Sequence, residues 1–187
     1  MKYLYCFVAM LVLSVAPASA ATLGWSLDKG TGTGSVVDLT AAGDYDVAFL
    51  LVGNGCGKQA CPVETTYTAA APDSSPASWH VSGFWSYLTL DKRGAAFDPF
   101  GFIVGGMKTQ LSDDAGLAAQ SGHFSFLVAT GEAFGWYVTS IDNKNGAGTA
   151  LVAADIAPIP PPAAGLLLIG GLGAFGMLRL RRQPARG

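Results

Sequence analysis

Apolar and polar residues alternate with a period of two along the middle of the chain, which is the pattern of β-strands. The segment 45–52 is apolar or aromatic at every odd position and partly apolar at its even positions. It therefore predicts a strand that is buried on one face and partly buried on the other. The other predicted strands are 84–90, 124–128, 134–138 and 151–156, with weaker ones at 24–27, 35–39, 65–69 and 100–104.

Turn signals separate these strands. Thr130-Gly131-Glu132 predicts a turn between two of them, and Asn145-Gly146 predicts a hairpin turn within 142–148. Only the segment 113–120 has the pattern of a short helix. Many short, aromatic-rich strands divided by glycine turns predict an all-β domain, an antiparallel β-sandwich of jelly-roll type.

The first twenty residues have the three parts of a secretory signal peptide. Lys2 supplies the positive charge, residues 4–15 the apolar run, and Ala18-Ser19-Ala20 the small-residue cleavage site. The apolar run is short for a membrane span. We therefore expect export with cleavage after Ala20, which leaves a secreted domain at 21–157.

The last thirty residues, 158–187, have the layout of a membrane anchor. Pro158 to Pro162 predict an extended hinge, because proline fixes φ and lacks a backbone donor. A helix over 163–180 would be roughly 27 Å long, close to the roughly 30 Å hydrocarbon core of a bilayer. A basic stop after this transmembrane helix predicts a cytoplasmic C-terminus. It consists of Arg179, Arg181, Arg182 and Arg186.

This tail resembles the PEP-CTERM class of sorting signals in its VPLPA variant. Ile159-Pro160-Pro161-Pro162-Ala163 corresponds to Val-Pro-Leu-Pro-Ala, and Ile159 and Pro161 are the two departures. The resemblance covers the tail alone. It implies that an exosortase, a membrane cysteine transpeptidase of Gram-negative bacteria, cuts near the motif. It also implies an inner-membrane anchor before processing and then a place at the cell surface or in the exopolysaccharide matrix.

The charge of the chain is unevenly distributed. Residues 21–157 contain all thirteen acidic residues and six of the basic ones, a net charge of −7. An acidic domain of this kind argues against nucleic acid as a partner, because nucleic-acid binding needs a basic surface. It is compatible with cation binding or with solubility alone.

Cys56 and Cys61 are the cysteines that remain after signal cleavage, and they enclose a glycine-containing loop. In an exported protein we expect this close pair to form a structural disulfide. The alternatives are a redox pair, which is more often spaced by two residues, and a metal site. Neither a histidine nor a third cysteine stands nearby to complete a zinc set.

His80 and His123 stand far apart in the sequence, without a nucleophile elbow or a metal-binding helix motif. Asp44 and Asp46 flank a strand start, where turn chemistry is the expected role. The segment 142–146 lacks the alternating carboxylates of a calcium loop. The sequence therefore predicts no catalytic residue, no metal site and no cofactor.

Three functions remain open at this point. The first is a non-enzymatic exported protein of the surface or matrix. The second is a carbohydrate-binding module for exopolysaccharide, and exposed, coplanar tryptophans would favour it. The third is a secreted hydrolase that uses His80 or His123, which requires a serine, cysteine or carboxylate within hydrogen-bond reach. The candidate stacking residues are Trp25, Trp79, Trp85 and Trp136. Their default role is core packing, because the aromatic content is ordinary for a β core.

Overall fold

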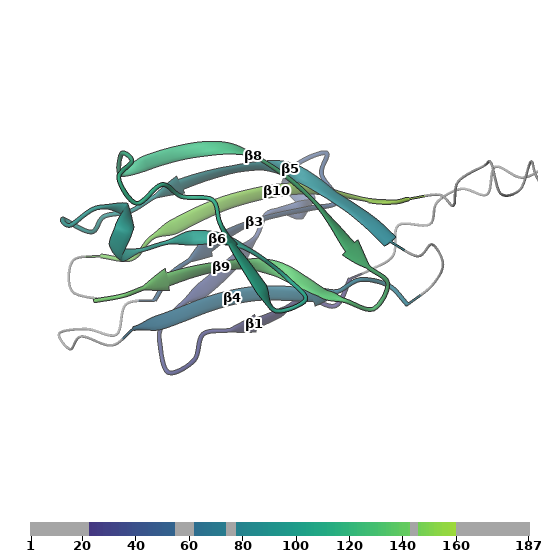
Figure 1. Ribbon diagram of the computed structural model, residues 1–187, viewed down its shortest axis with the longest axis horizontal. Coiled ribbons are helices and arrows are strands. Elements are labelled where there is room, and N and C mark those ends of the chain that lie inside the picture. The colour runs from purple at the N-terminus through teal and green to yellow at the C-terminus, as the bar shows by residue number, and fades with distance from the viewer. Residues whose placement is uncertain (1–22, 55–61, 74–77, 143–145, 160–187) are drawn as a thin grey trace, which may run out of the picture.

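A computed structural model describes residues 23–54, 62–73, 78–142 and 146–159, and these residues form two packed antiparallel sheets (Figure 1). Sheet A has the strand order β1-β4-β9-β6-β7, and sheet B has the order β2-β3-β10-β5-β8. The predicted all-β antiparallel sandwich is confirmed. The strands of sheet A are β1 (Ser26–Asp28), β4 (Val63–Ala70), β9 (Ala133–Ser140), β6 (Phe100–Val104) and β7 (Met107–Gln110). The strands of sheet B are β2 (Ser35–Asp38), β3 (Val47–Val52), β10 (Thr149–Pro158), β5 (Ser78–Leu88) and β8 (Ala119–Ala129).

The chain passes repeatedly from one sheet to the other. β9 pairs with β4 and β6 in sheet A, whereas β8 and β10, which precede and follow it, pair with β5 in sheet B. The turn at residues 130–132 is present, with Gly131 at φ 74°, but it connects two sheets. The prediction of a hairpin at 142–148 is wrong, because a hairpin joins two paired strands of one sheet. The strands that flank this segment lie in different sheets, and local turn residues do not reveal that.

Aromatic side chains fill the space between the sheets. Trp136 and Phe134 on β9 and Phe49 on β3 are almost completely buried. The Trp136 ring centroid lies 5.4 Å from that of Phe49 and 5.4 Å from that of Phe124. Aromatic rings favour tilted or perpendicular contacts at this distance, because the face of each ring is negative and its edge is positive. The period of two in the sequence therefore reports which residues face this core.

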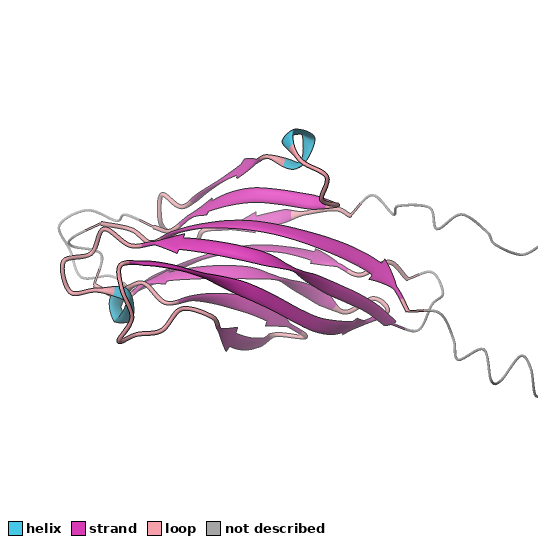
Figure 2. Ribbon diagram, turned by 90° about the horizontal axis from the view of Figure 1, so that it is seen from above, coloured by secondary structure: helices cyan, strands magenta, loops and turns pink. Residues whose placement is uncertain are grey.

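Two local predictions differ from the structure. The segment 113–120 is not a helix: residues 113–118 form a turn whose side chains bond to its own backbone, and residues 119 and 120 begin β8. Asp113 Oδ1 accepts from Ala115 N at 3.0 Å, and the Gln120 side-chain amide donates to the carbonyls of Asp113 and Leu117. Such local bonds compete with helical ones. The only helical turns in the described residues are two short 3-10 segments, Thr40–Ala42 and Ala95–Phe97 (Figure 2).

Several predictions lie outside the described residues: the signal peptide with Ala18 and Ala20, Cys56 and Cys61, and the chain from Pro160 through the basic stop. Within the described residues, no helix is long and apolar enough to cross a membrane. Ile159, the first residue of the sorting motif, is described. Its backbone N–H donates to the Ser78 carbonyl at 3.1 Å. The tail thus begins directly where β10, the central strand of sheet B, ends.

Candidate functional site

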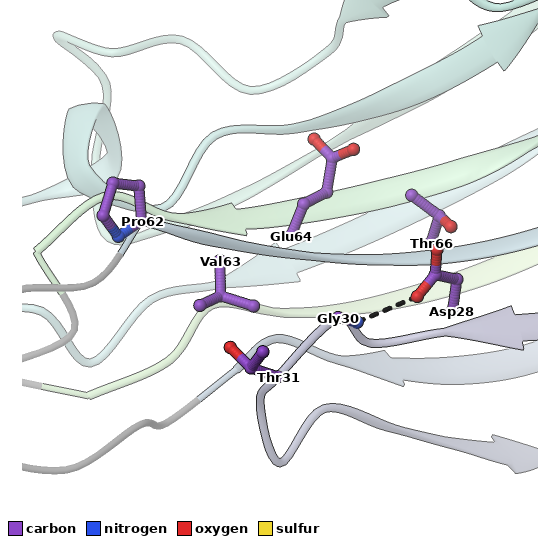
Figure 3. Close-up of a pocket in the computed structure, with 7 residues that line it drawn as sticks. All are labelled: Asp28, Gly30, Thr31, Pro62, Val63, Glu64 and Thr66. Atoms are coloured by element: carbon purple, nitrogen blue, oxygen red, sulfur yellow. Dashed lines mark hydrogen bonds between the residues drawn. The ribbon is translucent and has the colours of Figure 1, made fainter.

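An open pocket of about 310 Å³ lies beside the turn between β1 and β2 (Figure 3). Asp28 ends β1, and its carboxylate accepts from Gly30 N at 2.8 Å, which closes the turn. Gly30 has φ 53°, a conformation that glycine adopts without strain. The start of β4 forms the opposite wall. The lining residues are Asp28, Gly30, Thr31, Pro62, Val63, Glu64 and Thr66.

Glu64 connects this pocket to the outer face of sheet A. Its Oε2 accepts from Lys108 Nζ at 2.5 Å and from Thr139 Oγ1 at 2.9 Å, and so joins β4 to β7 and β9. Lys108 Nζ also lies 5.2 Å from the centroid of the Tyr137 ring, within the range of a cation–π contact. Burial raises the pKa of the Tyr137 hydroxyl, and the charges of Glu64 and Asp114 add to the rise.

The strand register extends this group across the sheet. Asp28 pairs with Thr66, Thr66 with Tyr137, Tyr137 with Gly101, and Gly101 with Gln110. One row therefore crosses all five strands. We call this row, together with Glu64, Lys108 and Thr139, the polar strip of sheet A. It presents carboxylates, hydroxyls, an ammonium group and an amide, so it can both donate and accept hydrogen bonds.

The two histidines lie on the outer face of sheet B and are not brought together. His80 on β5 pairs with Leu127, whereas His123 on β8 pairs with Phe84, four residues further along β5. His80 Nε2 lies 2.8 Å from Ser125 Oγ, so a serine is within hydrogen-bond reach, and the condition set for a hydrolase is met. No carboxylate in the described part of the chain is hydrogen-bonded to His80. The pair lies on an exposed sheet face.

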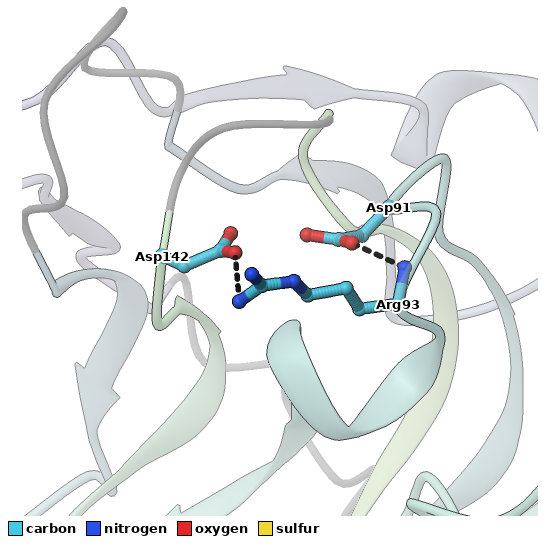
Figure 4. Close-up of polar contacts among 3 residues, drawn as sticks. All are labelled: Asp91, Arg93 and Asp142. Carbon is cyan, nitrogen blue, oxygen red and sulfur yellow. Dashed lines mark hydrogen bonds and ion pairs between the residues drawn. The ribbon is translucent and has the colours of Figure 1, made fainter.

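A third polar group closes one end of the sandwich (Figure 4). Arg93 Nη1 lies 3.0 Å from Asp142 Oδ2, and the Asp91 carboxylate accepts from Arg93 N at 2.7 Å. In Figure 4 the two carboxylates point toward each other, with the guanidinium group beside Asp142. Asp142 was predicted as a turn residue, and its partner stands 49 positions away in the sequence. A contact at that separation leaves no local signal.

Asp98 lies behind this group and is completely buried. Thr89 Oγ1 donates to its Oδ2 at 2.6 Å, whereas Asp98 Oδ1 and Ser140 Oγ have no hydrogen-bond partner in the described part of the chain. Burial raises the pKa of the Asp98 carboxyl. The hydrogen bond from Thr89 opposes the rise. So does the Ser140 hydroxyl, which lies near the carboxyl without meeting hydrogen-bond geometry, whereas the charges of Asp91 and Asp142 add to the rise. No group of three or more histidines, cysteines or acidic residues among those described is arranged to hold a metal ion.

The tryptophans do not form the exposed platform that sugar stacking requires. Trp79, Trp85 and Trp136 are buried in the core. Trp25 is partly buried and stacks on Tyr67 with 5.0 Å between centroids. Core packing, the default expectation for these tryptophans, is therefore confirmed, and the alternative that they line a sugar-stacking surface is wrong, since all four pack inward. Any sugar site on this domain has to use other groups.

Comparison with known proteins gives likenesses of shape alone. No family model and no curated protein matches the sequence. One similar solved structure is TmCBM61 in complex with β-1,4-galactotriose, with TM-score 0.40, 13% identity, and 72% of this chain and 88% of that chain covered. Another is a family 35 carbohydrate-binding module from Clostridium thermocellum, with TM-score 0.33, 14% identity, and 72% and 98% covered. Similarity this low carries no argument about function.

Proposed function

We propose that this protein is an exported, non-catalytic protein of the cell surface or extracellular matrix that binds polysaccharide through the polar strip of sheet A. One observation carries the proposal: Glu64 on β4 lines the pocket and also bonds to Thr139 on the neighbouring β9 and to Lys108 on β7. Charged donors and acceptors fixed on the same face of a sheet are groups that sugar hydroxyls can bind. The pocket beside them gives a sugar ring a place to lie.

The geometry supports binding by hydrogen bonds instead of ring stacking. Lys108 and Thr139 hold Glu64 in place before any ligand arrives, and this preorganisation lowers the entropic cost of binding. The net charge of −7 on residues 21–157 disfavours acidic polymers. We therefore expect a neutral polysaccharide, and modest affinity, because no exposed tryptophan contributes.

The routes of export and attachment belong to the same proposal. The signal peptide directs the chain across the inner membrane, and the tail at 158–187 holds it there until an exosortase acts. The jelly-roll character of the sandwich is part of the proposal too. It is supported by the repeated passage of the chain between sheets A and B.

Affinity electrophoresis in native gels that contain galactan, xylan or alginate tests the binding. We expect the domain to be retarded by at least one of the two neutral polymers and not by acidic alginate. Glu64→Ala should raise the apparent dissociation constant obtained from this retardation about tenfold, since a hydrogen bond to a charged group contributes roughly 1.5–3 kcal/mol. Asp155→Ala removes an exposed carboxylate of sheet B and serves as the matched control. Equal retardation of the two variants, or none for the wild type, would contradict the proposal.

A second candidate, a secreted hydrolase, is favoured by the 2.8 Å contact between His80 and Ser125. A histidine at this distance can take the proton of a serine nucleophile. A fluorophosphonate probe decides between the two candidates. Labelling that Ser125→Ala abolishes and Ser82→Ala preserves would establish the hydrolase. If the probe does not label the wild-type protein, the hydrolase is excluded.

A further inference from the structure

Sheet B ends on one side in a long strand with a single neighbour. β8 covers eleven residues and lies along the upper margin of Figure 1 for much of its length, and among the described strands it pairs only with β5. The three other edge strands, β1, β2 and β7, are only three or four residues long, and β7 carries Lys108. β8 contains no acidic residue, lysine, arginine or proline. Short length, charge and proline are the usual protections of an edge strand, and β8 has none of them.

The register identifies the backbone groups that face the open edge. Thr89 N donates to the Ala118 carbonyl at 2.9 Å, in line with the pairing of Leu88 with Ala119. Hydrogen-bonded pairs alternate along antiparallel strands, so the even-numbered residues of β8 bond to β5. The odd-numbered residues point their N–H and C=O groups outward. These are Ala119, Ser121, His123, Ser125 and Leu127, and within the described chain none of them makes a backbone hydrogen bond outside the strand pairing.

The end of the strand supports this assignment. Ala129, the next odd residue, is capped by Glu132, whose carboxylate accepts from Ala129 N at 2.9 Å. Glu132 N in turn donates to the Ala129 carbonyl at 3.0 Å. The outward groups are therefore satisfied within the chain where β8 turns into β9. Along the rest of the strand they are open to a partner.

We propose that this partner is a second copy of the chain, paired antiparallel through β8 about a two-fold axis, so that the two sheets B become one sheet of ten strands. Self-pairing centred on His123 uses all five outward residues. It places Ala119 opposite Leu127 and Ser121 opposite Ser125 of the second copy. The small Ala119 thus faces the exposed Leu127, and two serines that can exchange hydrogen bonds face each other.

Charge favours the same edge. Residues 21–157 carry a net charge of −7, so two copies repel each other over most of their surfaces. β8 brings no fixed charge to the contact. An isologous contact also closes after two copies, so it ends in a dimer and not in a fibre.

A cysteine trap tests the pairing in the full-length chain exported by a Gram-negative host. At a hydrogen-bonded pair the two Cα atoms are about 5.5 Å apart, which lies within the disulfide range. His123→Cys should therefore give a covalent dimer on a non-reducing gel after mild oxidation. Ser86→Cys is the matched control. Ser86 lies on β5, is exposed on the same face of sheet B as His123, and pairs with Ser121. In the dimer the two copies of residue 86 would be three strand spacings, roughly 14 Å, apart across the sheet and a further four residues, roughly 13 Å, apart along the strands.

A charge variant tests the same contact without a covalent bond. His123→Glu places two carboxylates directly opposite each other across the axis, so in mild detergent the full chain should sediment as a monomer. Ser86→Glu should remain dimeric, and both variants should keep the wild-type circular dichroism spectrum, since both sites are exposed. The proposal is overturned if His123→Cys and Ser86→Cys cross-link equally, if the wild type is monomeric, or if His123→Glu stays dimeric. The last result would mean that the tail or another surface holds the copies together.

Discussion

Replacing Asp98 by asparagine should stabilise the protein at neutral pH. Asp98 is completely buried, and its Oδ1 lacks a hydrogen-bond partner in the described chain. Burial raises the pKa of this carboxyl, so ionisation of the folded state is unfavourable. Asparagine carries no charge, keeps an acceptor for Thr89, and brings an N–H group that can donate to Ser140 Oγ. The substitution therefore removes a charge penalty and gives two unpaired atoms a partner.

The sign and size of the effect follow from linkage. A raised folded-state pKa contributes stability below the ordinary value of 3.8, and this contribution is lost as the pH rises through the folded pKa. At a pH above the folded-state pKa, each unit by which folding raises the pKa of Asp98 lowers the free energy of unfolding by about 1.4 kcal/mol. For a domain of this size that corresponds to roughly 5 °C in Tm. Asp98→Asn should thus melt higher than the wild type at pH 7, and the difference should shrink toward pH 3.

Thermal melting of residues 21–157, followed by circular dichroism from pH 3 to pH 8, measures this difference. Asp155→Asn serves as the control, because it makes the same chemical change at an exposed position of sheet B. We expect that variant to follow the wild type at every pH. An Asp98→Asn variant that is no more stable than the wild type at pH 7 would refute the reasoning. So would a gain that is the same at pH 3 and pH 7.

Three further predictions concern the core and the two ends of the domain. Trp136→Ala should lower the free energy of unfolding by about 3–5 kcal/mol in urea titrations, because it empties the centre of the aromatic core; a loss below 1 kcal/mol would show that the ring does not organise it. Cys56 and Cys61 should be bridged, so mass spectrometry of the exported chain should find two fewer hydrogens, and alkylation of both thiols without reduction would exclude the bridge. Deleting 158–187 should release a soluble domain into the periplasm, and surface protein that still contains residues 166–178 would show that the tail anchors without being cut.

The sequence by itself revealed the strands that face the core. Alternation is a local property, and residues such as Phe49 and Trp136 had to point inward wherever their strands paired. The predicted strand at 100–104 agrees with β6, and 84–90 marked only the second half of β5. β7 was missed, because all four of its residues are exposed and it therefore carries no apolar pattern.

Only the tertiary structure decided which strands pair and which polar groups meet. Glu64 and Lys108 are 44 residues apart, His80 and Ser125 are 45 apart, and a one-residue slip in register would separate either pair. The open edge of β8 is a further example. The sequence shows that this strand lacks fixed charge and proline, but only the structure shows that it lies at the end of sheet B. Strand order follows from how the whole chain closes its core, and that is a property of many distant contacts at once.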